Sequence, residues 1–293
     1  VLGKVTVVVF APEDLALVKG DPRERRRFLD QLTIQRSPRI AAIIADLDKL
    51  LRQRSALLKR LAAKRRGGVK VDTSLLDVFD DQFVTLAAQL TAARIKTLAL
   101  LRPHLVEAYH TVASGQSDAA VVVKSGITGG ELDAHHEAEF HDEHIVASRM
   151  REALAAAREK ELDRAITLIG PQRDDYIFTL GSLPARGYAS HGESWSLALA
   201  LRLASFQLLA AQADASGRGT PILILDDVFA ELDATRRNRL AEIVAAAEQV
   251  CITAAVPTDV PAQLETTWFH VEDAQVIPIA SPHEHQDDDD KSR

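Results

Sequence analysis

Cysteine, aromatic residues and long apolar runs are all scarce in this chain of 293 residues. Its single cysteine, Cys251, excludes an internal disulfide and fits a reducing, cytoplasmic compartment. No uninterrupted run of about 18 apolar residues is present, so the sequence predicts no membrane span, and no secretory signal is recognisable. Aromatic residues make up only 5%, but hydrophobic residues reach 46%, which favours a helix-rich globular protein over a disordered one.

The net charge of −7 argues against a nucleic-acid-binding protein, but the basic residues are unevenly distributed. Between Lys49 and Lys70 there are nine Lys or Arg residues and no acidic residue. Such a stripe can neutralise several phosphates, whereas solvated helix faces usually mix both signs. We expect DNA contact here, with a solvated helix face as the alternative. The residues expected to contact DNA are Arg52, Arg54, Lys59, Arg60, Lys64, Arg65 and Arg66.

Two carboxylates follow an apolar run in the last third of the chain. Residues 221–225 predict a buried parallel strand, and Asp226 and Asp227 come directly after it. The carboxyl ends of such strands are where open α/β sheets bind ligands. A magnesium–nucleotide site needs one carboxylate near the metal and a second group that orients or deprotonates the attacking water. An acidic strand-to-turn junction without any such role is the alternative.

A Ser-x-Gly-Glu sequence opens the apolar helical run 194–209. Ser190 and Gly192 at the start of a helix place a hydroxyl and free backbone N–H groups where an anion can bind. The same residues also predict an ordinary helix cap, with Ser190 satisfying the first turn. The two roles are compatible with each other.

The order of these elements resembles a known family. The serine–glycine signature, the acidic strand and the turn Glu231-Leu232-Asp233 follow one another as in the ABC-type ATPase heads of the SMC-like family. Within that family the chain resembles the RecF recombination proteins, and His191 in the signature is similar to actinobacterial members. The resembling blocks are residues 12–22 with 25–30, residues 170–175, and residues 224–233 with Arg237 and Leu240.

The resemblance covers nearly the whole chain and implies an α/β fold. An ABC-ATPase-like head, present here mainly as its C-terminal lobe, would carry an inserted, mainly α-helical arm domain. The implied parts are a remnant of the N-terminal lobe at 1–22, the arm at 23–164, the C-terminal lobe at 165–280 and a disordered acidic tail at 281–293.

The resemblance also gives roles to the two acids and to a threonine. Asp226 would hold Mg²⁺, and Asp227 would be the catalytic residue that positions the attacking water. Thr253, at the end of the next predicted strand, is the candidate switch that senses the γ-phosphate.

The remaining roles concern a pair of subunits. Ser190, Gly192 and Glu193 would form the signature that touches the γ-phosphate of ATP held by a second subunit. The D-loop residues Glu231 and Asp233 would couple the two sites of an ATP-dependent homodimer.

The function implied by the resemblance is DNA repair and replication. Such a protein would bind single-stranded and gapped double-stranded DNA with ATP and Mg²⁺ as cofactors. It would assist recombinase loading in recombinational repair and the SOS response, together with RecR- and RecO-like proteins.

The chain departs from the family in one respect, because it contains no G-x-x-x-x-G-K-[ST] loop to cradle nucleotide phosphates. Gly3-Lys4 lacks both the upstream glycine and a following Ser or Thr. We therefore expect an N-terminally incomplete RecF with negligible ATPase activity of its own. A non-catalytic DNA- or partner-binding module is the competing hypothesis, and a relic that cannot fold alone is the third.

Apolar periodicity and turn residues predict the elements that frame these motifs. Long helices are expected at 39–66, at 75–101 with an interruption or bend at Pro103, and at 145–166. Strands are expected at 5–10, 121–124, 167–169, 176–180, 249–253 and 268–272. The tract around His136 and His141 predicts either a metal site or, as we favour, a solvated acidic helix start.

Overall fold

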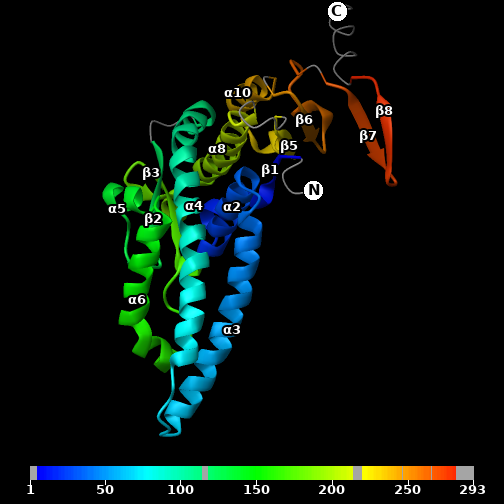
Figure 1. Cartoon of the computed structure of the whole chain (residues 1–293). Helices are drawn as coiled ribbons and strands as arrows, with labels where there is room; N and C mark the ends of the chain where they lie inside the picture. The colour runs from blue at the N-terminus through cyan, green and yellow to red at the C-terminus, as the bar shows by residue number, and fades with distance from the viewer. Residues whose placement is uncertain (1–4, 114–117, 214–219, 246, 265, 282–293) are drawn as a thin grey trace, which may run out of the picture.

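The computed structural model describes residues 5–113, 118–213, 220–245, 247–264 and 266–281. The predicted acidic tail from residue 282 onward and the Gly3-Lys4 pair lie outside these residues. Figure 1 shows an elongated molecule, with a head built on strands at one end and three long helices extending from it. The helices are α1 (Leu15–Lys19), α2 (Pro22–Arg36), α3 (Ile40–Arg66), α4 (Ser74–Val112), α5 (Ala134–Glu139), α6 (Glu143–Arg164), α7 (Ala185–Tyr188), α8 (His191–Ala210) and α10 (Ala234–Ala245).

A three-stranded parallel sheet lies in the head. Its strands are β1 (Val7–Phe10), β5 (Ile222–Asp226) and β6 (Val250–Thr253), in the order β1-β5-β6. All three strands were predicted. Because the strands are parallel, their carboxyl ends meet at one edge of the sheet, and this edge carries Asp226 and Thr253 side by side.

Helix α8 is the central helix of the head. Fourteen of its 20 residues are buried, as expected for a helix that is apolar on all sides. One side packs along α4, and another covers β1, where the rings of Phe10 and Trp195 lie 4.9 Å apart. The exposed residues of α8, His191 and Glu193, lie in its first turn, which holds the signature.

Helices α3, α4 and α6 pack side by side to form the extension seen in Figure 1, which we call the arm. The predicted helices at 39–66 and 145–166 are confirmed as α3 and α6, each to within two residues. A small separate core holds the far end of the arm together. It consists of Leu57, Leu58, Leu61, Leu76 and Leu162.

Pro103 was expected to interrupt or bend the second long helix, and the predicted interruption is wrong. Helix α4 continues through Pro103 to Val112. A proline inside a helix costs about 3 kcal/mol, but Leu101, Leu105 and Tyr109 around it are all buried against neighbouring helices. Burying several such side chains, at about 1.5–3 kcal/mol each, outweighs the cost of the proline.

Among the described helices, α4 is the one that is long and apolar enough to cross a membrane by length and composition alone. Most of that apolar stretch is buried inside the protein. Packing against α3, α6 and α8 accounts for its composition, and the core helix of a soluble protein passes the same test.

A second, antiparallel sheet joins the predicted arm to the predicted lobe. It contains β2 (Ala119–Lys124), β3 (Asp175–Leu180) and β4 (Leu183–Pro184) in that order. Strand β2 pairs with β3 over its whole length, across the boundary expected at residue 164. The two sides of that boundary therefore share one sheet and one continuous core.

The strand predicted at 167–169 is not formed. The N–H of Leu168 donates to the Glu161 carboxylate at 2.7 Å, and the Thr167 hydroxyl accepts from Arg54 at 2.8 Å. These side-chain bonds satisfy the segment without a neighbouring strand. At the C-terminal end, the predicted strand β7 (Trp268–Glu272) pairs with β8 (Gln275–Ile279) in a two-stranded hairpin.

Candidate functional site

The two predicted acids lie at the carboxyl edge of the parallel sheet. Leu223 and Leu225 of β5 are fully buried, so the strand is anchored in the core while Asp226 at its end is exposed. The register places Asp226 opposite Thr253, the last residue of β6. A hydroxyl and two carboxylates thus meet at the edge where such sheets bind ligands.

Thr253 connects the two acids through its hydroxyl. The hydroxyl donates to Asp226 Oδ1 at 2.5 Å and accepts from the backbone N–H of Asp227 at 3.1 Å. The same N–H lies 3.2 Å from the Thr253 carbonyl oxygen. Asp227 adopts a φ of 53°, in the left-handed region that Asp tolerates better than most residues. The structure therefore fixes the backbone of Asp227 and one oxygen of Asp226, and leaves both carboxylates open to solvent.

This pair of carboxylates fits the metal half of a magnesium–nucleotide site. Mg²⁺ in such sites is held by one or two carboxylates, by phosphate oxygens and by water. Within the described part of the chain, no group of three or more His, Cys, Asp or Glu residues is placed to hold a metal alone. The phosphate half does not fit, because the 293 residues contain no G-x-x-x-x-G-K-[ST] loop.

The signature forms a reciprocal cap at the start of α8. The Ser190 hydroxyl accepts from the Glu193 N–H at 3.2 Å, and the Glu193 carboxylate accepts from the Ser190 N–H at 2.8 Å. Hydrogen bonding of the Glu193 carboxylate to the Ser190 side chain, and secondly to the Ser190 backbone N–H, holds the pKa of Glu193 below its ordinary value. The capping prediction is thus confirmed. The positive end of a 20-residue helix remains exposed beside it, where anions bind well.

Arg236 of α10 lies against the signature, and the sequence analysis did not single it out. A Cβ built on Gly192 would lie 3.3 Å from Nη1 of Arg236. The D-loop residue Asp233 accepts from the backbone N–H of Arg236 at 2.9 Å, and its carboxylate lies 3.5 Å from the Arg236 Nε. The signature and the D-loop therefore meet at one arginine. An Asp followed three residues later by an Arg at a helix start was the available signal.

The remaining D-loop residue, Glu231, lies in the short 3₁₀ turn η3 (Phe229–Glu231) between β5 and α10. No hydrogen bond or ion pair between described residues joins the Asp226–Thr253 group to the signature. The structure thus presents two separate surfaces, one with acids and one with a capped helix end.

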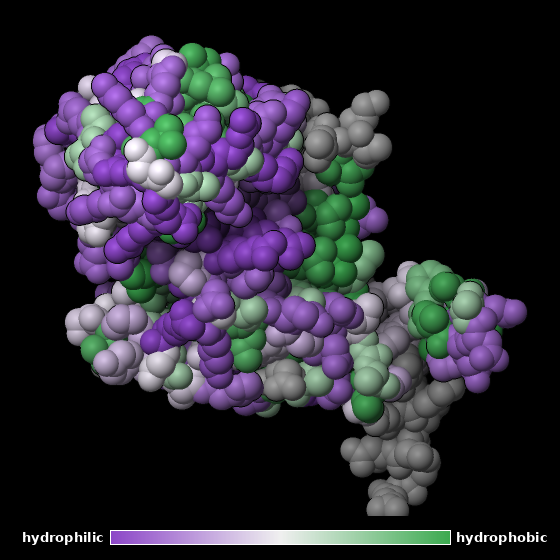
Figure 2. Space-filling view, turned by 90° about the horizontal axis from the view of Figure 1, so that it is seen from below, coloured by the Kyte–Doolittle hydropathy of each residue, from purple (hydrophilic) through white to green (hydrophobic). Residues whose placement is uncertain are grey.

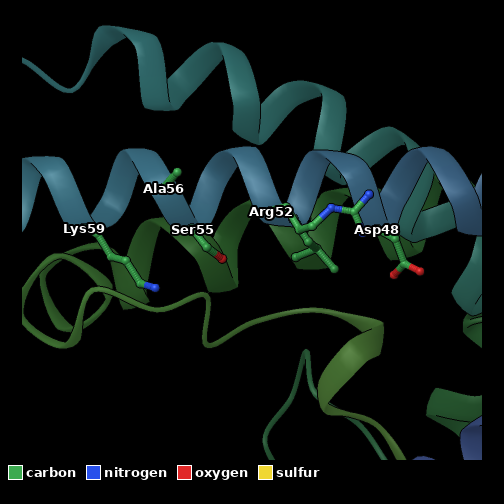
Figure 3. Close-up of a pocket in the computed structure, with 6 residues that line it drawn as sticks. Asp48, Arg52, Ser55, Ala56 and Lys59 are labelled. Carbon is green, nitrogen blue, oxygen red and sulfur yellow. The ribbon is translucent and has the colours of Figure 1, made fainter.

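The basic stripe of α3 divides into two faces. At about 100° per residue, Arg54 and Arg65 point toward α6 and the others point away from it. Arg65 forms ion pairs with Glu159 at 2.7 Å and Asp163 at 3.6 Å. Figure 3 shows Arg52, Ser55 and Lys59 along one side of α3, where they line a shallow open groove. Of the predicted DNA-contacting residues, those that are exposed and have no ion pair with a described acid are Arg52, Lys59, Arg60, Lys64 and Arg66.

Arg54 corrects the DNA-binding prediction. Its side chain is 0% exposed and donates to Asp80 at 2.7 Å, to Glu161 at 2.5 Å and to Thr167 at 2.8 Å. A guanidinium held in this way cannot reach a DNA phosphate. The apolar and basic periodicity of α3 could not reveal this, because the acids come from α4 and α6.

In the view from below, hydrophilic residues cover most of the near end of the arm (Figure 2).

The Gly-Pro-Gln-Arg-Asp-Asp block at 170–175 connects α2 and α4 to β3 through largely buried polar contacts. Asp175 binds Arg25 of α2 with two hydrogen bonds, at 2.7 and 3.0 Å. Asp174 accepts from the Gly126 N–H at 2.7 Å and lies 3.7 Å from Arg94 of α4. Burial raises the pKa of Asp174 to about 6, although Arg94 and Gly126 act against this rise. The block therefore ties α2 and α4 to β3.

The His-rich tract forms helix caps. Asp133 caps α5 by accepting from the His136 N–H at 2.8 Å, and its carboxylate also bonds the His136 ring at 2.8 Å. Asp142 caps α6 in the same way through the N–H of His144.

Comparison with known proteins places these features in context. No protein-family model matches the chain. The chain is 53% identical over 272 residues to the DNA replication and repair protein RecF of Kineococcus radiotolerans, covering 90% of this chain and 68% of that protein. It is 50% identical over 278 residues to the RecF of Frankia alni, covering 94% of this chain and 71% of that protein.

The fold is similar to solved structures. The recombination mediator protein RecF with ATP, from the RecFOR pathway, gives a TM-score of 0.77 at 23% identity. This match covers 95% of the present chain and 69% of the solved one. A second RecF structure, of the recombination mediator protein RecF-ATPrS in the RecFOR pathway, gives a TM-score of 0.79 at 22% identity. The predicted α/β head with a helical arm is confirmed.

Proposed function

The chain belongs to the RecF family of DNA replication and repair proteins, and from that premise we propose that its arm binds DNA in step with the ATP-dependent pairing of two heads. The observation that carries the proposal is the division of α3 into a neutralised face and a basic face. Five cations face solvent and have no acidic partner among the described residues, while Arg54 and Arg65 are paired with acids. Unpaired cations in a row suit the regular charges of a phosphate backbone.

The nucleotide half-sites are assigned to the two surfaces of the head. When Mg·ATP is bound, it supplies the phosphate charge that links two subunits. Asp226 is placed to hold the metal, Asp227 to position water, and the Thr253 hydroxyl to keep both acids oriented. Ser190 and the first N–H groups of α8 are placed to accept the γ-phosphate presented by a second subunit. Glu231 and Asp233 follow the two acids in the chain and would couple the two sites of the dimer.

The biological role follows from the family. We assign the protein to the repair of single-stranded and gapped double-stranded DNA, where it assists recombinase loading, acts in the SOS response and works in the cytoplasm. RecR- and RecO-like proteins are the proposed partners. The chain spans 68% and 71% of the two RecF relatives named above, and the ATP-linked function requires a phosphate-cradling loop that the 293 residues do not contain.

A second function rests on that same missing loop. As it stands, the chain holds the metal-side acids and the signature without a phosphate cradle, which suits a DNA- or partner-binding module without catalysis. In that case DNA binding is independent of ATP.

Fluorescence anisotropy with a gapped duplex, with and without Mg·ATP, tests both functions. The double change Lys59→Glu/Arg60→Glu should weaken binding by at least tenfold and lower the slope of log K against log salt by about 2–4, since two cations are lost and two anions are gained. Arg151→Glu/Lys160→Glu makes the same charge change on exposed positions of α6 and serves as the control.

The outcomes separate the two hypotheses. If both double variants lose the same affinity, binding depends on net charge alone and the α3 surface is wrong. ATP-independent binding favours the non-catalytic module. Binding that Mg·ATP strengthens, and that Asp226→Ala makes insensitive to Mg·ATP, favours the ATP-linked function.

A further inference from the structure

We infer that Arg236 is a further γ-phosphate-contacting residue of the signature surface, and this inference rests on the proposed pairing of two heads. The signature supplies a hydroxyl and backbone N–H groups, but its own carboxylate, Glu193, is used in the cap. A cation beside this helix end would complete an anion site, and Arg236 is placed to supply it.

The guanidinium of Arg236 lacks the partners that such a group requires. Its side chain is only 19% exposed, and its Nε is shielded from solvent without a hydrogen-bond partner. Among the described side chains, the acid within ion-pair distance of it is Asp233, whose carboxylate lies 3.5 Å from Nε, which is too long for a good charge-assisted bond. Neither Nη1 nor Nη2 donates a hydrogen bond to any described residue. Of the five donors, the buried Nε is therefore left without a hydrogen bond, and the four N–H groups on Nη1 and Nη2 remain available to a ligand.

The surroundings make an unpaired cation costly at this position. Gly192 is in the first turn of α8, where the helix dipole is positive. A guanidinium within 3.3 Å of the Gly192 side-chain position therefore faces a second positive charge. An anion between Arg236 and the helix end would satisfy the free donors and remove this repulsion.

Gly192 also gains a physical role from this contact. An alanine there would place its Cβ 3.3 Å from Nη1 and would push the guanidinium away by a few tenths of an ångström. The glycine thus leaves room for Arg236 beside the helix backbone. The ligand class that fits is a terminal phosphate carried by the opposing subunit, because a planar guanidinium and helix N–H groups both match phosphate oxygens.

The test measures the association of this chain with a longer RecF relative that carries the G-x-x-x-x-G-K-[ST] loop. Analytical ultracentrifugation gives the Kd in Mg·ATP and in Mg·ADP for the wild type, Arg236→Gln, Arg236→Lys and Ser190→Ala. Arg237→Gln is the matched control, because this neighbour on α10 also has a buried Nε without a hydrogen bond, but its Nη1 and Nη2 donate to the Thr258 and Leu232 carbonyls and it lies 3.7 Å from Asp259.

We expect Arg236→Gln to weaken association at least tenfold in Mg·ATP and to leave it unchanged in Mg·ADP. Arg236→Lys should recover part of the loss, and Arg237→Gln should change neither Kd. The Tm of Arg236→Gln should stay level or rise, because an unsatisfied cation has been removed. A merely structural arginine would lower the Tm and weaken both nucleotide states equally.

The failures can be told apart. If Ser190→Ala abolishes ATP-dependent association while Arg236→Gln leaves it intact, the inference is wrong and the proposed function stands. If the wild-type chain shows no ATP-dependent association, the pairing of heads and the inference fall together. If Arg236→Gln unfolds the chain, the role of Arg236 is structural unless Arg236→Lys folds and still loses the ATP-dependent part.

Discussion

Removing Arg54 should destabilise the protein far more than removing any exposed arginine of the same helix. Arg54 joins Asp80 of α4 to Glu161 of α6, and both Arg54 and Glu161 are 0% exposed. Burial raises the pKa of Asp80, even though hydrogen bonding to Arg54 lowers it. Arg54→Ala leaves the Glu161 charge buried without its cation. Breaking a buried pair in this way costs about 3–5 kcal/mol.

That loss converts into a measurable shift in Tm. Unfolding entropies near 2.1 cal/mol/K per residue give about 0.6 kcal/mol/K for a chain of this length, so the Tm should fall by about 5–8 °C. Differential scanning calorimetry measures it directly. Arg52→Ala, two positions away and exposed, is the matched control and should change stability by no more than about 0.5 kcal/mol.

A double variant tests the electrostatic cause. Arg54→Met with Glu161→Gln removes both charges and keeps an acceptor for the Leu168 N–H, while Asp80 retains Arg158 at 3.0 Å. Replacing a buried pair by neutral side chains is close to neutral in free energy, so most of the lost Tm should return. The reasoning is refuted if Arg54→Ala and Arg52→Ala have the same Tm, or if Arg54→Ala weakens DNA binding without any loss of stability.

Three further predictions follow from the site and its supports. Asp227 has a left-handed φ of 53°, so Asp227→Asn should keep the unfolding free energy within about 0.5 kcal/mol while Asp227→Val loses about 1–2 kcal/mol in urea denaturation. Hydrogen bonds from Ser190 lower the pKa of Glu193, so this bond stabilises the fold above pH 4.5 and is lost as the pH falls through the lowered pKa. In Ser190→Ala, an NMR titration should show the pKa of Glu193 rising back toward 4.5, and an unchanged titration would contradict the capping assignment. Gly170 has a φ of 120°, and a Cβ there would lie 2.5 Å from the ring of Phe83, so Gly170→Ala should lose at least about 2 kcal/mol by thermal unfolding.

Local patterns in the sequence predicted most of the fold. The apolar steps of α3 and α6 gave both helices within two residues, because helical periodicity depends only on neighbouring residues. The continuation of α4 through Pro103 could not be read in this way, because the burial that outweighs the proline comes from α8. The same applies to residues 167–169, whose backbone bonds a glutamate of α6 instead of a strand.

The candidate site likewise contains features that local sequence patterns predicted and features that depend on tertiary packing. The acids at the end of β5 and the cap at the start of α8 were predictable, because residues that are neighbours in the sequence determine where a strand ends and where a helix begins. The Thr253 bridge between Asp226 and Asp227 could be suspected only from the order of parallel strands. The contact of Arg236 with Gly192, and the neutralisation of Arg54, depend on which faces meet in three dimensions, and no spacing within one segment encodes that.

Helix α4 has a mechanical consequence that follows from its length. It contains 39 residues and is therefore about 58 Å long. One part of it packs along α8, whose first turn holds the signature, and the opposite end, at Ser74, lies near the tip of the arm (Figure 1). A rigid rod held at one end works as a lever, so a tilt of about 5° beside α8 would swing the Ser74 end by about 5 Å. That displacement is close to the spacing of neighbouring phosphates along one DNA strand, at about 3.4 Å of helix axis each. A small rotation of α4 beside α8 would thus move the tip of the arm by about the distance between neighbouring nucleotides.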